Sequence, residues 1–121
     1  MLLDSNIVIY AQQPKHAWLR TLIAENAPSV SAVSYVEVLG YHDLLEEERA
    51  ALEKFFAAAR VLPLDNAVLL RATRLRQARK MSLGDALVAG TALEYGLKLV
   101  TRNVRDYRWI EGLEVLDPFA A

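Results

Sequence analysis

The chain has 121 residues, which is the size of one ordinary domain. Its 14 basic and 15 acidic side chains nearly cancel, which is unlike the strongly basic composition of an arm-type nucleic-acid binder. It contains no cysteine, so disulfides, thiolate zinc sites, iron–sulfur centres and a cysteine nucleophile are excluded, and a reduced cytoplasmic compartment fits. Because it shows neither a basic leader region nor an uncharged stretch of about 18 residues, we expect a soluble domain.

The apolar content is higher than a chain of this size needs. The hydrophobic fraction is 54%, whereas about 45–50% is typical. Such an excess points to a subunit or partner interface, and a tight alanine-rich core is the alternative interpretation.

Short apolar runs alternate with helical patterns along the chain. Strands are predicted at 1–3, 30–33, 61–64, 97–100 and 115–116, and helices at 15–25, 34–59, 66–79 and 82–95. Gly96 is a helix stop signal after the last of these helices. Repeated strand and helix in one short chain predicts an α/β fold, with a parallel sheet covered by helices on both faces.

Acidic residues follow the ends of the predicted strands. Asp4 comes after the first strand, Glu37 after the second and Asp106 after the strand at 97–100, while Asp85 lies in the first turn of the preceding helix. Ligands of open parallel sheets bind outside the carboxyl ends of the strands. We therefore expect these four acids to converge on one edge of the sheet.

Each of three acids also has a purely structural interpretation. Asp4 fits the N-cap of a short helix at 7–11, and both Ser34-x-x-Glu37 and Ser82-x-x-Asp85 have capping-box spacing. Asp85 also heads an apolar helical stripe, where an unpaired carboxylate is costly and suggests a cation. Three such coincidences at the strand ends of one small sheet favour a site.

A carboxylate cluster without histidine or cysteine suits Mg²⁺ or Mn²⁺ better than zinc. His16 and His42 have no metal-ligand spacing to each other. Carboxylates around such ions are the recurring apparatus for phosphodiester hydrolysis, because the ion generates hydroxide and stabilises charge on the phosphoryl oxygens.

Five segments form a recognisable pattern, in order along nearly the whole chain: 2–6 (LLDSN), 34–38 (SYVEV), 82–89 (SLGDALVA), 99–107 (LVTRNVRDY) and 112–118 (GLEVLDP). Taken together, these segments resemble the PIN domain family, and within it the small VapC-type toxins of prokaryotic toxin–antitoxin pairs.

The resemblance implies one three-layer α/β/α domain over 1–121 with a central parallel sheet. It also implies a Mg²⁺- or Mn²⁺-dependent endoribonuclease that forms a homodimer and is inhibited by a cognate antitoxin. Catalytic roles fall on Asp4, Glu37, Asp85 and Asp106. Asp4 and Asp85 are then the principal metal ligands, and Glu37 is a ligand or orients the attacking water.

Four further positions belong to the same pattern. Ser5 and Thr101 match hydroxyl positions that support the site. Asn103 stands where many members of the family have a second aspartate, so either Asn103 or Asp106 supplies the fourth position. Tyr107 stands where a phenylalanine is usual.

Two basic features are candidates for binding RNA or a partner. Arg102, Arg105 and Arg108 lie three residues apart beside Tyr107 and Trp109, a pattern that fits phosphate contacts and base stacking near the site. The basic stripe from Arg71 to Lys80 is better explained as a solvated helix face, with an acidic or extended antitoxin segment as a further candidate for it.

Two other functions fit the sequence less well. A phospho-receiver domain has similar length and alternation, but it requires paired acids after the first strand and a lysine after the last, and neither is present. A PIN-like module that binds RNA or a partner without cleaving it remains the alternative to a nuclease.

Overall fold

The computed structural model describes residues 1–120, so Ala121, the last residue of the predicted domain, lies outside the described residues. Five short strands form one sheet: β1 Leu2–Leu3, β2 Ser29–Ser31, β3 Arg60–Leu62, β4 Leu99–Val100 and β5 Val115–Leu116. Their order is β3-β2-β1-β4-β5, and all four pairings are parallel. The predicted parallel sheet is confirmed.

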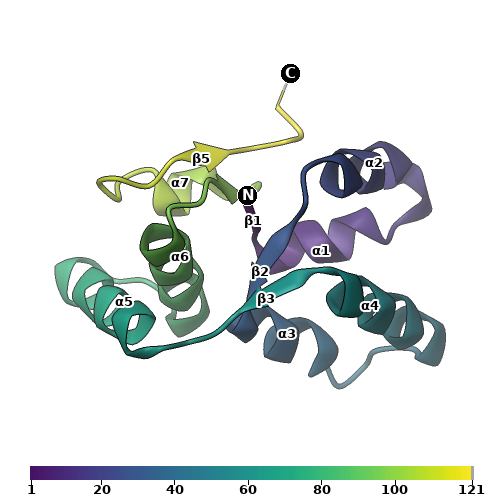
Figure 1. Cartoon of the computed structure of the whole chain (residues 1–121), viewed down its shortest axis with the longest axis horizontal. Helices are drawn as coiled ribbons and strands as arrows, with labels where there is room; N and C mark the ends of the chain where they lie inside the picture. The colour runs from purple at the N-terminus through teal and green to yellow at the C-terminus, as the bar shows by residue number, and fades with distance from the viewer. Residues whose placement is uncertain (121) are drawn as a thin grey trace.

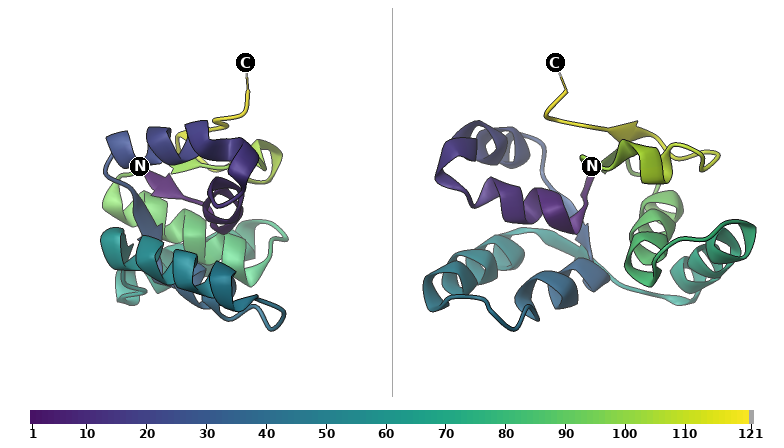
Figure 2. Two further views of the ribbon diagram at one scale, coloured as in Figure 1. Left: turned by 90° about the vertical axis from the view of Figure 1, so that its right-hand side faces the viewer. Right: turned by 180° about the vertical axis from the view of Figure 1, so that it is seen from behind.

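Helices lie on both sides of this sheet. Those from the first half of the chain, α1 to α4, lie to one side of it, and α5, α6 and α7 lie to the other (Figures 1 and 2). This is the predicted α/β/α arrangement. Their bounds are α1 Ser5–Ala11, α2 Ala17–Glu25, α3 Ala32–Leu39, α4 Glu46–Ala58, α5 Asn66–Ala78, α6 Leu83–Tyr95 and α7 Val104–Tyr107, with a 3-10 turn at Pro14–His16. None of the helices in residues 1–120 combines the length and apolar character needed to cross a membrane.

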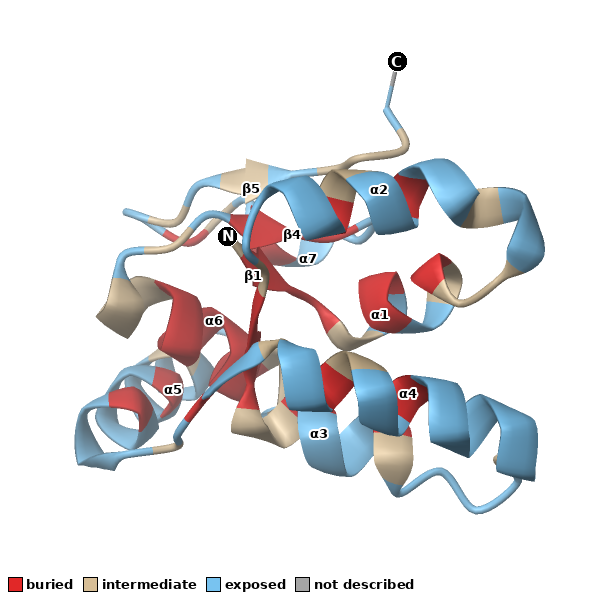
Figure 3. Cartoon of the chain, turned by 45° about the vertical axis from the view of Figure 1, so that its right-hand side comes forward, coloured by how far each residue is buried: buried red, intermediate tan, exposed pale blue. Residues whose placement is uncertain are grey.

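The strands supply both cores because successive side chains point to opposite faces. Leu3 and Val100 pack with apolar side chains of α1 to α4, whereas Leu2 and Leu99 pack with those of α6 and with Tyr107. In Figure 3 the buried segments run through the centre of the molecule between the two helical layers. The central strands β1, β2 and β4 can be this short because they are buried throughout, whereas the edge strands β3 and β5 are partly exposed.

The predicted helix over 34–59 is wrong, because two helices occupy this stretch. α3 ends at Gly40, whose amide donates to the Val36 carbonyl at 2.8 Å. α4 begins after Leu45, and Glu48 accepts from the Leu45 amide at 3.0 Å. α3 also starts at Ala32, so the strand predicted at 30–33 is shifted to 29–31.

The strand order places a topological switch point at β1, in the centre of the sheet. The chain proceeds from β1 through β2 to β3 on one side and returns to β4 and β5 on the other. Connections diverge to opposite faces beside β1, and such switch points are where α/β folds bind ligands at the carboxyl ends of the strands. Gly96, with a φ of 62°, ends α6 in the left-handed region as predicted and leads into β4.

Candidate active site

Asp4 lies at the centre of the sheet edge and is 5% exposed. It follows β1 directly and caps α1, with Oδ1 accepting from the Ser5 amide at 2.8 Å. Oδ2 accepts from the Thr101 hydroxyl, at the end of β4, also at 2.8 Å. The N-cap interpretation is therefore correct, but the cap uses only one of the two oxygens. The carboxylate also joins the ends of two adjacent strands.

Glu37 is not part of a capping box, because α3 begins two residues before Ser34 and is capped by Ser31. The three-residue spacing instead puts Ser34 and Glu37 on the helix face turned toward Ser5. The Ser5 hydroxyl lies 2.8 Å from Glu37 Oε1 and 2.9 Å from the Ser34 hydroxyl. Since Ser5 has one hydroxyl proton and a carboxylate only accepts, Ser5 donates to Glu37 and accepts from Ser34.

Asp85 forms only half of the predicted capping box. Ser82 caps α6 by accepting from the Asp85 amide at 3.1 Å. The reciprocal bond, from the Ser82 amide to the Asp85 carboxylate, is absent among the described residues. Instead, Asp85 Oδ1 accepts from the Tyr107 hydroxyl at 3.0 Å. The half-buried carboxylate therefore faces the end of the sheet.

Gly84 brings Glu37 close to Asp85. A Cβ atom at position 84 would clash with Glu37 Oε2 and would lie 3.2 Å from Glu37 Cδ. The Glu37 carboxylate thus lies against the first turn of α6, one residue from Asp85. Three of the four acids that were expected to converge, Asp4, Glu37 and Asp85, thus lie near one another at this edge of the sheet.

The three carboxylates influence one another electrostatically. Burial is the main cause that raises the pKa of Asp4, and the charges of Asp85 and Glu37 raise it further. The hydrogen bonds from Thr101 and Ser5 act in the opposite direction. Among residues 1–120, no lysine, arginine or histidine forms an ion pair with any of these three acids. Their negative charge is stabilised by neutral donors alone.

The two candidates for the fourth position lie at the rim. Asn103 and Asp106 are both exposed, in the residues that open α7. The Asn103 amide donates to the Thr101 hydroxyl at 3.0 Å, so this residue supports Asp4 indirectly through its backbone. The charge of Asp106 is one of the smaller causes that raise the pKa of Tyr107. The structure does not join Asp106 to the other acids by a hydrogen bond within residues 1–120.

The arginines beside α7 differ in how they are held. The Arg102 guanidinium carbon lies 4.1 Å from the ring centre of Phe119 and 5.1 Å from that of Tyr10. Arg105 and Arg108 are exposed. Tyr107 is fully buried, so the expectation that it lies beside these arginines as an accessible stacking ring is wrong.

The basic stripe from Arg71 to Lys80 makes local contacts. Arg71 pairs with Glu94 at 2.6 Å, and the Arg79 guanidinium carbon lies 5.3 Å from the centre of the Trp109 ring. Arg76 Nε donates to the Met81 carbonyl at 3.3 Å. Because these contacts engage three of the arginines with residues of this chain, they favour the solvated-face interpretation over an antitoxin-binding surface.

Sequence reasoning missed three residues of this site. Ser34 bonds Ser5, Gly84 leaves room for the Glu37 carboxylate, and Tyr107 binds Asp85. The serine had a usable signal, because residues three apart share one face of a helix. Gly84 also had a usable signal, because glycine is a poor helix former. Its place in the first turn of a helix, next to an acid, indicates that a side chain there would lack space.

The donor set suits a hard divalent cation. Asp85 Oδ2 and Glu37 Oε2 accept no hydrogen bond from the described residues. The atoms that the three acids offer to a metal ion are all oxygens, which Mg²⁺ and Mn²⁺ prefer. As they stand, no three acidic or histidine side chains in residues 1–120 are close enough to enclose one ion. Glu37 is exposed on a helix, so its rotamers are the freest of the three acids. The residues therefore fit such an ion in charge and donor type.

The comparisons with known proteins agree with this geometry. The PIN domain model matches residues 1–110. The chain is 30% identical to the tRNA(fMet)-specific endonuclease VapC of Shigella flexneri, over 96% of both chains, and 30% identical to ribonuclease VapC10 of Mycobacterium tuberculosis H37Rv, over 99% of this chain and 93% of the other. The crystal structure of DNA-bound VapBC from Salmonella typhimurium superposes with a TM-score of 0.84 at 25% identity, covering 96% of each chain.

The chain therefore belongs to the PIN domain family. Its relatives that match along nearly their whole length are VapC ribonucleases, so the VapC-type ribonuclease expected from the sequence is confirmed as its assignment within that family.

Proposed function

We propose that this protein is a Mg²⁺- or Mn²⁺-dependent endoribonuclease that acts as the toxin of a type II toxin–antitoxin pair in the cytoplasm. Asp4 and Asp85 are the principal ligands, Glu37 binds the ion or orients the attacking water, and Asp106 adds negative charge at the rim. The observation that supports it most is the convergence of three carboxylates with no basic partner among the described residues. When bound, the ion supplies hydroxide and stabilises charge on the transferring phosphoryl oxygens.

The chain's own residues hold this arrangement before RNA arrives. Thr101 and the Ser5 amide hold the buried Asp4, and the Ser5 hydroxyl orients the exposed Glu37. Both hydroxyls are neutral donors, so they orient the acids without cancelling their charge. Glu37 is exposed and Asp4 is buried, so Glu37 is the acid that can exchange a proton with water during hydrolysis.

The direct test is RNA cleavage by the purified protein. Transfer RNA, the substrate named for the Shigella relative, is the first RNA to try, followed by single-stranded RNA. We expect cleavage with Mg²⁺ or Mn²⁺ and none with EDTA. Cleavage that persists in EDTA would exclude the mechanism. RNA binding without cleavage under any divalent ion would support the non-cleaving module instead.

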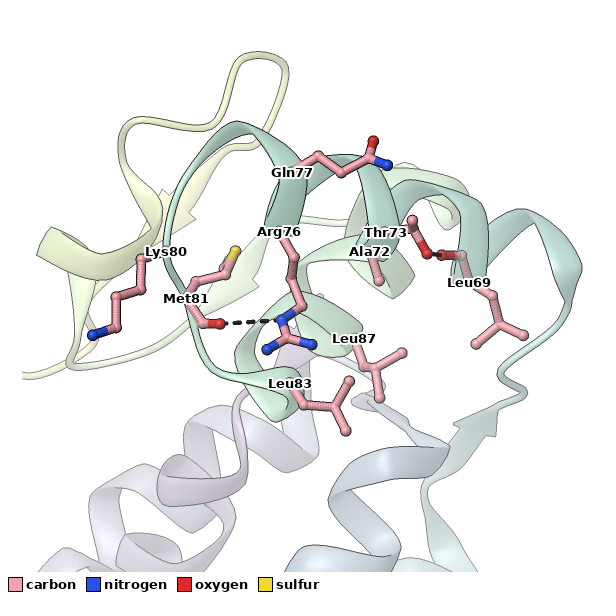
Figure 4. A pocket seen from close by; sticks show the side chains of 9 residues that line it. All are labelled: Leu69, Ala72, Thr73, Arg76, Gln77, Lys80, Met81, Leu83 and Leu87. Atoms are coloured by element: carbon pink, nitrogen blue, oxygen red, sulfur yellow. Dashed lines mark hydrogen bonds between the residues drawn. The ribbon is translucent and has the colours of Figure 1, made fainter.

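A homodimer is also proposed, through exposed apolar side chains on α3, α5 and α6. Val36, Leu69, Leu70 and Leu83 are 44–68% exposed on these helices. Leu69 and Leu83 line one hollow beside α5 and α6, together with Ala72, Leu87, Arg76 and Lys80 (Figure 4). Homodimers bury such self-complementary apolar patches.

Light scattering at micromolar concentration should give twice the chain mass of 13.6 kDa. Leu70→Glu should give a monomer, while Leu45→Glu, at a 67% exposed position before α4, should leave the dimer intact. A parent protein that is strictly monomeric would remove the dimer from the proposal.

The antitoxin is assigned to the groove between α1, α3 and α4. The groove has a volume of about 630 Å³, with apolar walls that include Ile9, Val38 and Leu52. Glu37, Glu47 and Glu48 also line it, so its charge complements a partner segment with apolar and basic side chains. The antitoxin partner itself is proposed because the Salmonella structural neighbour is a VapBC complex.

A further inference from the structure

We propose that Tyr107 is a positioning residue, whose hydroxyl holds the Asp85 carboxylate in the orientation that binds the divalent ion. This inference rests on the proposed function. It is carried by the bond of 3.0 Å between the Tyr107 hydroxyl and Asp85 Oδ1, which links the end of α7 to the first turn of α6.

The ring of Tyr107 is firmly placed. It is 0% exposed and packs in the core on the α6 side of the sheet, with Leu2, Val88 and Leu99 among its cluster. These neighbours belong to two central strands and to α6 itself, so the hydroxyl cannot move without disturbing the core. The Tyr107 hydroxyl, held by the core, therefore donates to Asp85 in the partly exposed first turn of α6.

The bond fixes one oxygen of Asp85 and leaves the other available. A phenol has one proton to donate, and a carboxylate can only accept. With Oδ1 engaged by Tyr107, Oδ2 is the oxygen left for the ion. Outer partners of ligating carboxylates hold them in the productive orientation, and their loss typically weakens metal affinity or activity about 10–100-fold.

Tyr107→Phe is the appropriate variant, because it removes the hydroxyl and keeps the buried ring. Tyr95→Phe is the matched control. Tyr95 also donates to an aspartate, Asp65 Oδ2 at 3.2 Å, but Asp65 caps α5 rather than lying in the site.

The first readout is the Mn²⁺ concentration that gives half of the maximal rise in melting temperature, measured without RNA. We expect it to increase about 10-fold or more in Tyr107→Phe and to be unchanged in Tyr95→Phe. The cleavage rate of Tyr107→Phe should lie closer to that of the parent at saturating Mn²⁺ than at low Mn²⁺. Loss of packing alone would lower the rate equally at both concentrations. Superimposable Mn²⁺ curves for Tyr107→Phe and the parent would overturn the inference and leave the proposed function intact. A parent with neither Mn²⁺ response nor metal-dependent cleavage would overturn both.

A second measurement needs no variant. In protein carrying ¹³C-labelled tyrosine, addition of Mg²⁺ should shift the ring resonance of Tyr107, the tyrosine that is fully buried among the described residues, and should leave that of Tyr95 in place. A Tyr107 resonance that does not move at Mg²⁺ concentrations that stabilise the protein would also overturn the inference.

Discussion

Acids on the surface of this protein and acids at its sheet edge are stabilised in different ways. On α4, Arg49 pairs with Glu46 and lies 3.8 Å from Glu53, and between α5 and α6 Arg71 pairs with Glu94. At the sheet edge, Asp4, Glu37 and Asp85 have only hydroxyl and amide donors.

The difference separates the acids that we propose for the active site from those that stabilise the surface. Exposed ion pairs contribute about 0–1 kcal/mol and are tolerant of substitution. Burial raises the pKa of Asp4, the charges of Asp85 and Glu37 raise it further, and both effects oppose folding while Asp4 is ionised. An arrangement that opposes folding is expected at a functional site rather than in a scaffold.

The largest expected effect separates the two groups by cleavage. Asp85→Asn should lower RNA cleavage by about 1000-fold, because several kcal/mol of transition-state stabilisation depend on the bound ion. Glu37→Gln should also cause a large loss. Glu53→Gln, on the paired surface of α4, should cleave like the parent and change stability by less than about 0.5 kcal/mol. Equal cleavage by Asp85→Asn and Glu53→Gln would show that the acids at the sheet edge matter no more for activity than the acids on the surface.

Gly84→Ala should disturb the site without weakening the fold. The added Cβ displaces the flexible end of Glu37, so cleavage should fall about 10–100-fold, while helix propensity stabilises α6 by up to about 1 kcal/mol. Gly90→Ala is the opposite control. Its Cβ would lie 3.0 Å from the Val68 carbonyl oxygen on α5, so it should lower the melting temperature and preserve the Mn²⁺ response. Full activity in Gly84→Ala would mean that the position of Glu37 is unimportant.

Arg102→Ala should weaken RNA binding more than Arg49→Ala does. Tyr10 and Phe119 hold the Arg102 guanidinium. Arg102 directly follows Thr101, which donates to Asp4. Loss of one phosphate contact should reduce the slope of log affinity against log salt by about 1. The measurement is RNA binding in EDTA at several salt concentrations, and an unchanged slope would remove Arg102 from the interface.

The smallest expected effect is a pH dependence of stability. Because the pKa of Asp4 is raised in the folded state, the folded protein binds the proton more tightly than the unfolded chain. Stability from this group is present below the unfolded pKa of about 3.9 and is lost as pH rises through the folded pKa. In EDTA, Asp4→Asn should therefore be at least as stable as the parent at pH 7, with the relative gain disappearing near pH 4. Thermal melts across this range test it, and a variant that is less stable only at pH 7 would contradict the sign.

Patterns of single elements predicted the sheet well and the local connections less well. Apolar runs located all five strands of the described chain, and they are clearest for the three central strands, which are buried throughout. The break at Gly40 was missed although three glutamates, Glu46 to Glu48, mark the start of α4, an arrangement that the helix dipole favours. α7 has four residues, too few for a periodic pattern.

The site could be predicted as a set of acids but not as a hydrogen-bond network. Ser34-x-x-Glu37 fits both a capping box and one shared helix face, and only the start of α3 at Ala32 decides between them. The contact between Tyr107 and Asp85 joins residues 22 apart, and such pairings depend on how α6 and α7 pack on the sheet. Spacing along the chain does not contain that information.

The most direct test of the metal site is a thermal melt of the parent, Asp4→Asn and Asp85→Asn, each with EDTA and with Mn²⁺. We predict that both variants melt at or above the temperature of the parent in EDTA, because removing one charge relieves repulsion. Mn²⁺ should stabilise the parent, by about 2.7 kcal/mol at 100 times the dissociation constant, and should have little effect on either variant. A clear loss of stability of both variants in EDTA, with the Mn²⁺ response intact, would show that Asp4 and Asp85 are helix caps and that the active site lies elsewhere.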